Sequence, residues 1–181
     1  MASDKFKAMV HYIVATCEDS KRLGAVRLNK ICWFSDTLSY RFTGASMTGE
    51  TYIKRKFGPV PKTILGALRE LQDEKKIGIF EHEVLPSRTM RMFVPLTEAP
   101  KQQFNPEELR ILDYVIDHVC NHHTANSISE LSHDSIWDAA NDGEEIPMCA
   151  TLVATPAELT PEVIEWARAV MKRVSGERSA A

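Results

Sequence analysis

The segment from Leu28 to Pro61 constrains the fold more than any other part of this chain. It reads LNKICWFSDTLSYRFTGASMTGETYIKRKFGPVP, so a dense apolar run is followed by a turn, a segment rich in β-forming residues and a Gly-Pro break. The run from Arg27 to Phe42 has helical spacing and is apolar on most of its faces, which is typical of a helix at the centre of a core. No residue type in the segment suggests catalysis, whereas its basic and aromatic residues suggest an exposed edge. The segment therefore predicts binding rather than chemistry.

The elements that flank this segment have clear periodicities. Residues 6–17 carry one apolar stripe at helical spacing, and Gly24 is expected to separate that helix from the next. Thr51–Phe57 alternates and predicts a strand, which Gly58–Pro61 is expected to end. Pro61 is expected to open a further helix that continues to about Lys76, because proline suits the first turn of a helix.

Two further strands are expected at Ile77–Leu85 and Thr89–Leu96, with Pro86-Ser87-Arg88 as their turn. A helix followed by a β-hairpin is also the order of elements in winged-helix proteins. A winged-helix-like DNA-binding regulator is therefore kept as the alternative function.

The second half of the chain is expected to be mainly helical. Asn105 with Pro106 and two glutamates predicts a helix start, and Ser127 with Glu130 has the form of a capping box. The segment 144–158 is expected to be an ordered loop, and Thr160-Pro161-Glu162 is expected to start a last amphipathic helix. We therefore predict a single α+β domain over residues 1–175, mostly helical with a small antiparallel sheet or hairpin, followed by a polar tail at 176–181.

Composition bounds the class of protein. Of the 181 residues, 44% are hydrophobic and 26% are charged, which is ordinary for a soluble globular protein, and no apolar run approaches the 18 residues of a membrane helix. The start of the chain lacks the pattern of a signal peptide. The four cysteines are widely spaced without a CxxC pair, which favours reduced, buried side chains. We expect a cytoplasmic protein with no membrane partner.

The charges are unevenly distributed, which favours a charged partner. Residues 1–97 contain 16 Lys and Arg against 10 Asp and Glu, whereas residues 98–165 contain 2 against 14. The basic part includes a candidate partner-binding edge on the predicted strand and hairpin, which could meet phosphates or an acidic protein surface. Charged residues also guard strand edges against aggregation, so a purely protective role stays open. The edge consists of Tyr52, Lys54, Arg55, Lys56, Phe57, Arg88 and Arg91.

Candidate catalytic and metal sites are weak by comparison. His118 and His122 could share a helix face, but there is no HExxH pattern and no second closely spaced pair, so no metal is expected. Ser132, His133 and Asp134 are adjacent, and neighbouring helical residues point about 100° apart, which rules out a triad. Glycine-rich phosphate motifs are absent from the sequence. We expect neither enzymatic activity nor a cofactor.

Several short motifs, taken in order, resemble those of one family. Leu28-Asn29-Lys30-Ile31 leads into Trp33-Phe34-Ser35-Asp36, and Thr48-Gly49-Glu50-Thr51-Tyr52 is followed by Phe57-Gly58-Pro59-Val60-Pro61. Farther on comes Leu131-Ser132-His133 with Trp137. Together, over about residues 26–146, these motifs resemble the Panacea domain of the SocA-like antitoxins. The residues that match are Lys30, Trp33, Asp36, Gly49, Gly58, Pro59, His133 and Trp137.

The resemblance implies an antitoxin that neutralises a cognate protein toxin by direct contact. It also implies a possible adaptor role, in which the toxin is handed to a ClpXP-type protease. Some members of the family carry an added DNA-binding domain, for which this chain has no room, and we expect no nucleic-acid partner. We expect the matching residues to maintain the fold rather than to contact the toxin. Neither the toxin nor the oligomeric state can be predicted from the resemblance.

Overall fold

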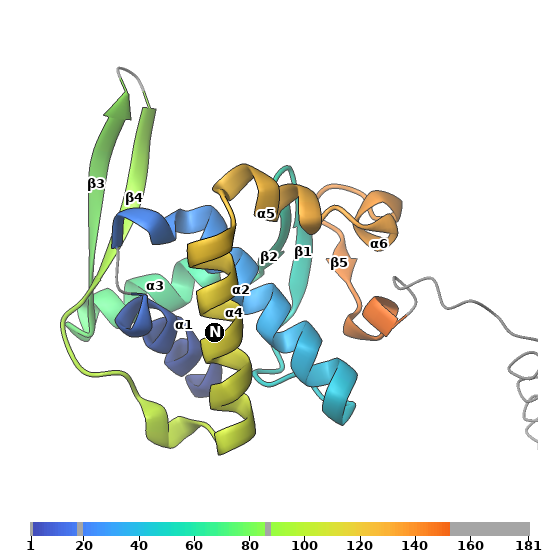
Figure 1. Ribbon diagram of the computed structural model, residues 1–181, viewed down its shortest axis with the longest axis horizontal. Coiled ribbons are helices and arrows are strands. Elements are labelled where there is room, and N and C mark those ends of the chain that lie inside the picture. Colours follow the sequence, from blue (N-terminus) through green and yellow to red (C-terminus); the bar gives the residue numbers. More distant parts are fainter. Residues whose placement is uncertain (1, 18–19, 86–87, 153–181) are drawn as a thin grey trace, which may run out of the picture.

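A central helix, α2, organises the molecule, with helices and two small sheets packed around it (Figure 1). The computed structural model describes residues 2–17, 20–85 and 88–152. The elements are α1 (Asp4–Thr16), α2 (Ser20–Thr43), β1 (Tyr52–Arg55), β2 (Gly58–Pro61), α3 (Ile64–Asp73), β3 (Ile77–Leu85), β4 (Arg88–Pro95), η1 (Lys101–Gln103), α4 (Pro106–His122), α5 (Ala125–Leu131), α6 (Ser135–Ala139), β5 (Glu145–Ile146) and η2 (Met148–Leu152). This arrangement confirms the predicted α+β class, mostly helical with small antiparallel sheets.

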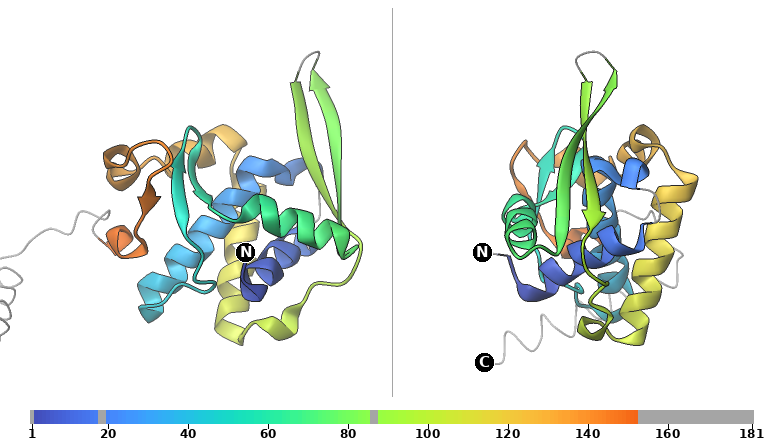
Figure 2. Two further views of the ribbon diagram at one scale, coloured as in Figure 1. Left: turned by 180° about the vertical axis from the view of Figure 1, so that it is seen from behind. Right: turned by 90° about the vertical axis from the view of Figure 1, so that its left-hand side faces the viewer.

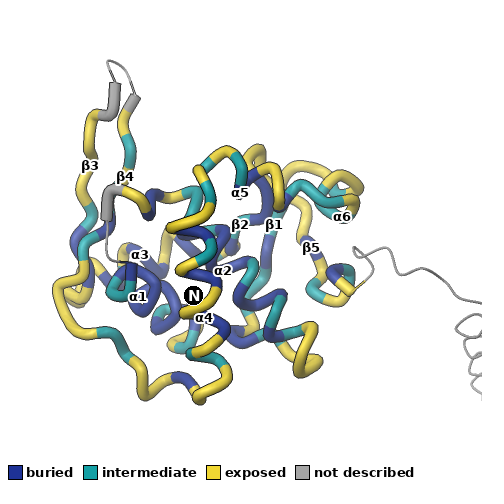
Figure 3. The backbone as a smooth tube through the Cα atoms, in the orientation of Figure 1, coloured by how far each residue is buried: buried dark blue, intermediate teal, exposed yellow. Residues whose placement is uncertain are grey.

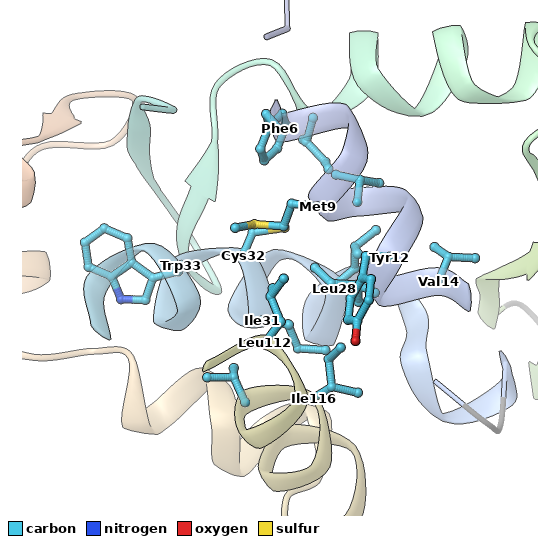
Figure 4. Close-up of a cluster of buried hydrophobic side chains, with 14 of the residues drawn as sticks. Phe6, Met9, Tyr12, Val14, Leu28, Ile31, Cys32, Trp33, Leu112 and Ile116 are labelled. Carbon is cyan, nitrogen blue, oxygen red and sulfur yellow. The ribbon is translucent and has the colours of Figure 1, made fainter. Parts of the chain in front are cut away.

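The core forms where α1, α2 and α4 meet. Apolar side chains from the three helices converge on one cluster (Figure 4). Phe6 of α1, Ile31 of α2 and Leu112 of α4 are fully buried in it. Gly24 was predicted to separate the first two helices, but α1 ends at Thr16 and Gly24, with φ of 53°, is a kink inside α2. The predicted apolar stripes of α1 and α4 are thus the faces that pack on α2.

The first sheet differs from the prediction. Gly58–Pro61 does not end a strand and start a helix; it is strand β2, which pairs antiparallel with β1, and α3 begins only at Ile64. Pro59 lies opposite Lys54 and Pro61 opposite Tyr52, on alternate positions of an edge strand. Proline is tolerated there because its missing N–H is directed away from the ladder. The two prolines therefore fit an edge strand, and the prediction of a helix start at Pro61 is wrong.

A short third strand completes this sheet. β5 pairs antiparallel with the other edge of β1, which gives the order β2-β1-β5. The backbone of Lys54 adds two hydrogen bonds on this side, to Gly143 and Glu144, both 2.9 Å long. The segment 144–158 was predicted to be a loop, so β5 and the following η2 correct that prediction for residues 145–152. Residues 153–158 and the predicted last helix lie outside the described residues.

The second sheet is the hairpin β3–β4, which confirms the predicted pair of strands. It projects away from the helices, and the left view of Figure 2 shows it apart from the β1–β2 hairpin. Residues 81–83 of β3 are exposed, whereas Ile77 and Phe93 at the base of the hairpin are buried in the core (Figure 3). It follows α3, as the alternative of a winged-helix protein supposed.

Capping residues define the helices of the second half. Asn105 caps α4 in a full capping box with Glu108, and Pro106 is its first residue, as predicted. The predicted box at Ser127 and Glu130 is wrong, because Thr124 is the cap of α5 and Ser127 is its reciprocal partner. Asp134 caps α6, accepting from the backbone N–H groups of Ile136 and Trp137. Within the described residues, no helix combines the length and apolar character needed to cross a membrane.

Candidate partner-binding site

Three residues of α2 contact the β1–β2 hairpin on the side that faces this helix. Lys30 Nζ donates a hydrogen bond to the Pro59 carbonyl oxygen over 3.3 Å. The ring of Trp33 packs edge-on against Tyr52, with centroids 5.0 Å apart, and the Tyr52 hydroxyl donates to the Asp36 carboxylate over 2.8 Å. Three residues at successive turns of one helix thus fix the hairpin along its length.

Asp36 is a fully buried carboxylate that accepts several hydrogen bonds. Besides the Tyr52 hydroxyl, it accepts from the backbone N–H and the hydroxyl of Thr48, at 2.9 and 2.5 Å. Burial raises the pKa of Asp36, and the hydrogen bonds from Thr48 and Tyr52 oppose that rise. Because its donors come from the turn before β1 and from β1 itself, Asp36 determines where the hairpin starts.

Lys30 is buried without a carboxylate partner among its described hydrogen bonds and ion pairs. Burial lowers the pKa of Lys30 from 10.5 to about 7, because the ammonium form loses its hydration. The lysine lies directly against Gly58, whose φ of 99° few other residues adopt. A Cβ at this position would collide with Lys30 Nζ and with Ser132 Oγ. Gly58 is therefore required both by backbone conformation and by close packing.

The second half of the chain holds the hairpin from the side. Ser129 of α5 donates to the Phe57 carbonyl oxygen over 2.9 Å, and the indole N–H of Trp137 donates to the Arg55 carbonyl oxygen over 3.2 Å. Lys54 Nζ lies 4.1 Å from the centroid of the Trp137 ring, and it donates to the carbonyl oxygens of Asp138 and Ala140. These contacts bind the hairpin to α5, α6 and the loop beyond them.

His133 completes this lateral contact. Its ring stacks on Trp137, with centroids 3.8 Å apart and planes inclined by 10°. Burial lowers the pKa of His133, and the charge of Lys30 lowers it further. The neutral imidazole is therefore favoured at pH 7, which suits a stacking role.

The part of the hairpin left exposed is its tip, Arg55–Phe57. Phe57 is 57% exposed although it is a large apolar residue. Lys56 is exposed beside it, with Nζ 5.6 Å from the centroid of the Phe57 ring. Arg55 is also exposed and forms a surface ion pair with Asp142 over 3.3 Å. The hairpin tip thus combines one aromatic side chain with basic neighbours on a backbone held from two directions.

The structure brings together only part of the predicted binding edge. Tyr52 is 1% exposed and lies in the core, so it does not belong to the surface. Lys54 is half-buried against Trp137, and its ammonium already has two acceptors. Arg91 is exposed on β4, and Arg88 is the first residue of the same strand; both belong to the other hairpin. Arg55, Lys56 and Phe57 alone form one exposed group.

Most residues of the family motifs support the β1–β2 hairpin. Gly49 takes a φ of 68° in the turn before β1, and His133 stacks on Trp137. Each of the other motif residues contacts the β1–β2 hairpin or is part of it. Ser129 and Thr48 also support the hairpin, through Phe57 and Asp36, and the sequence did not indicate them as site residues. Ser129 contacts the tip across 72 positions of sequence, and no local pattern signals such a contact.

The geometry of Ser132, His133 and Asp134 does not fit a catalytic triad. Ser132 Oγ donates to the Ser129 carbonyl oxygen over 2.7 Å, and Asp134 is used as a helix cap, so the two do not act on His133 as a triad would require. In the ranges that the structure describes, no three His, Cys, Asp or Glu side chains are placed to hold a metal ion. Cys17 and Cys120 are buried thiols with sulfur atoms 3.3 Å apart.

Comparison with known protein families supports the resemblance that the sequence motifs indicated. Neither a curated protein nor a solved structure matches the chain. The family model described as "Antitoxin SocA-like, Panacea domain" matches residues 28–138, a range that begins in α2 and ends in α6. That range contains every motif residue that holds the hairpin. The chain therefore belongs to the SocA-like antitoxin family with a Panacea domain.

Proposed function

We propose that this protein is a non-enzymatic antitoxin that neutralises a cognate protein toxin by direct binding, with the hairpin tip as the centre of the contact. The proposal rests on one observation: within the matched range, one group of residues holds the hairpin in place and another is exposed at its end. Buried and half-buried family residues, Lys30 and Trp137 among them, hold the β1–β2 hairpin, and its exposed end presents Phe57 beside Lys56. A rigid aromatic anchor costs little conformational entropy on binding, and aromatic residues are enriched among the strongest contributors to interfaces.

The chemistry of the tip indicates what it would contact. Phe57 fits an apolar depression, and Lys56 and Arg55 fit acidic residues at the rim of that depression. Such a surface on the toxin would be covered when the complex forms. Occlusion of the toxin's working face would then be sufficient for neutralisation.

Co-expression with the neighbouring gene tests the function. The neighbour is expected to arrest growth alone and to be harmless when this protein is abundant. The antitoxin function is refuted if the neighbour is harmless alone, or if it stays toxic in the presence of this protein. A DNA-binding regulator would instead bind DNA with an affinity that falls steeply with salt and that is lost when residues 54–56 are changed to glutamate.

Two variants test the place of the contact. Phe57→Ser is expected to weaken toxin binding by about tenfold or more, as expected when a central aromatic anchor is lost. Phe80→Ser is the matched control, because Phe80 is 56% exposed on the other hairpin. Titration calorimetry with purified toxin measures both. Equal affinities of the two variants would show that the tip is not part of the interface with the toxin. They would not refute the antitoxin function.

An adaptor role would add a second contact, to a ClpXP-type protease. Toxin half-life in cells with and without the protease separates the two mechanisms. Shorter half-life only when the protease is present supports delivery, whereas full rescue at an unchanged half-life leaves occlusion alone.

A further inference from the structure

Two cysteines that are far apart in the sequence have adjacent sulfur atoms where α1 and α4 end. Cys17 directly follows α1, Cys120 lies in the last turn of α4, and their sulfur atoms are 3.3 Å apart although 103 positions separate them. A disulfide bond is about 2.05 Å long, so each sulfur has to move by about 0.6 Å, which a side chain achieves by torsion within one rotamer well. The pair is therefore placed to form a bond without rearrangement of the helices.

Contacts along the rest of the two helices keep the cysteines in register. Lys5 Nζ forms an ion pair with the Glu108 carboxylate over 2.5 Å near the starts of α1 and α4. Farther along, the Tyr12 hydroxyl donates to the Asp113 carboxylate over 2.6 Å. These contacts and the cysteine pair follow one another in the same order on both helices. The positions of the two thiols are thus fixed by the packing of α1 against α4.

A hollow beside the pair gives small molecules access to it. Cys17 and Cys120 are 8% and 7% exposed, and both line an open hollow of about 710 Å³. Its other walls include Tyr12, Asp113 and Asn121 of the same two helices. A small uncharged oxidant such as a peroxide can therefore reach thiols that larger molecules reach poorly.

The surroundings of Cys120 slow the reaction of the pair with an oxidant. The hydrogen bond with Cys17 and burial raise the pKa of Cys120, whereas the charges of Arg27 and Arg22 lower it. Because the thiolate is the reactive form, its small population makes the first step slow. The second step is fast by comparison, since the partner sulfur is already at 3.3 Å. Sustained oxidation, and not a brief exposure, is thus what converts the pair.

From these observations we propose that Cys17 and Cys120 are a redox-reactive pair, which a peroxide converts to a disulfide that joins the end of α1 to the end of α4. One thiolate attacks the peroxide, the O–O bond breaks, and the products are a sulfenic acid and a hydroxide, which takes up the proton of that thiol. The sulfur of the other thiol attacks the sulfenic sulfur, the S–O bond breaks, and water leaves with the second proton. Two thiols and one hydrogen peroxide thus give one disulfide and two water molecules.

The disulfide holds together two helices that pack on α2. Side chains of α1 and α4 meet those of α2 in the core (Figure 4), and a bond between residues 17 and 120 closes a loop of 103 residues. A cross-link over such a loop stabilises the folded chain mainly by restricting the unfolded one. The antitoxin is then most stable under oxidising conditions. The proposal concerns the isolated chain and does not depend on the toxin contact at the hairpin tip.

Peptide mapping of the full chain tests the bond. Cys149 is exposed, and trypsin leaves it in the same peptide as Cys120, residues 111–168, so the mapping uses Cys149→Ser. This protein is treated with hydrogen peroxide, the remaining thiols are alkylated, and the tryptic digest is analysed without reduction. The expected product joins residues 8–21 to residues 111–168, is lost after treatment with dithiothreitol, and comes from a band that migrates as one chain on a non-reducing gel. Neither cysteine of the pair is replaced, so the result does not depend on how a core substitution folds.

Thermal unfolding of the same samples tests the consequence. Peroxide is expected to raise the unfolding midpoint by about 10 °C, and dithiothreitol is expected to reverse the rise. Dithiothreitol does not reduce methionine sulfoxide, the other product of peroxide, so the reversible part of the change reports the disulfide. Cys120→Ser in the same background is the control and is expected to lack that reversible rise. A bond to Cys32, a bond between two chains, no product joining residues 8–21 to 111–168, no reversible rise, or an equal rise in Cys120→Ser would each overturn the proposal.

Discussion

Replacing Lys30 by methionine is expected to stabilise the protein near neutral pH. Lys30 is 1% exposed, and burial lowers its pKa to about 7, against 10.5 for an unperturbed lysine. Between these two pH values the unfolded chain binds a proton that the folded protein lacks. The free energy of unfolding therefore rises with pH through this window, by at most about 1.4 kcal/mol per pH unit.

The magnitude follows from the shift. A pKa that falls from 10.5 to about 7 corresponds to about 5 kcal/mol of stability. That amount is missing at pH 7 and below, where the buried amine is protonated, and it is recovered as the pH approaches 10.5. Methionine fills a similar volume and carries no charge, but it loses the hydrogen bond to the Pro59 carbonyl oxygen, which contributes about 1 kcal/mol. Lys30→Met is thus expected to be more stable by about 2 to 4 kcal/mol at pH 6.5.

Urea denaturation at pH 6.5, 7.5, 8.5 and 9.5 measures the effect. The difference in free energy of unfolding between Lys30→Met and the unchanged protein isolates Lys30 together with its effect on the pKa of His133, because the titrating groups that Lys30 does not influence cancel. That difference is expected to shrink steadily as the pH rises. Lys56→Met, at an exposed position, is the control and is expected to show a small difference that does not vary with pH.

Two results would refute this reasoning. A difference for Lys30→Met that is constant from pH 6.5 to 9.5 would show that the pKa of Lys30 is not shifted by burial. A large loss of stability at pH 6.5 would show that the ammonium is stabilised by its surroundings more than by water.

Three further substitutions have defined expectations. Gly58→Ala is expected to destabilise the fold by about 3 kcal/mol, from a positive φ and from collision with Lys30 and Ser132, whereas Gly66→Ala, where a Cβ meets nothing, serves as its control; equal stabilities in urea would contradict the close packing. Asp36→Ala leaves the Tyr52 and Thr48 donors unpaired and is expected to cost about 3 kcal/mol or more, and Tyr52→Phe in the same background should then cost less than it does alone, as a double-mutant cycle would show. Asn105→Ala removes the cap of α4 and is expected to lower the free energy of unfolding by about 1 kcal/mol; a thermal midpoint equal to that of the unchanged protein would speak against the capping box.

Much of the helical framework could be predicted because it depends on local sequence patterns. The apolar stripes of α1 and α4 and the cap at Asn105 each depend on residues a few positions apart. The first sheet could not be predicted in the same way. β2 contains two prolines, which are acceptable only because β2 is an edge strand, and β5 has two residues and exists through its pairing with β1. Both depend on partners that a local pattern does not reveal.

The candidate site was predicted in part for the same reason. The exposed group Arg55–Phe57 was within the predicted edge, since basic and aromatic residues cluster there in sequence. Tyr52 was included because strand alternation placed it beside Lys54 and Lys56, but its hydroxyl is directed to Asp36 in the core. The strand ends at Arg55, so alternation does not extend through Lys56 and Phe57.

The position of β5 has a consequence for synthesis of the chain. β1 and β2 leave the ribosome early, but the strand that covers the second edge of β1 follows only after the chain from Lys62 to Glu144 has been made. At ordinary elongation rates this interval lasts roughly 4 to 17 seconds. During that time the nascent chain carries an uncovered strand edge next to the exposed Phe57, and such edges pair readily with other chains. Products that terminate before residue 145 keep that edge permanently, and aggregation is their expected fate.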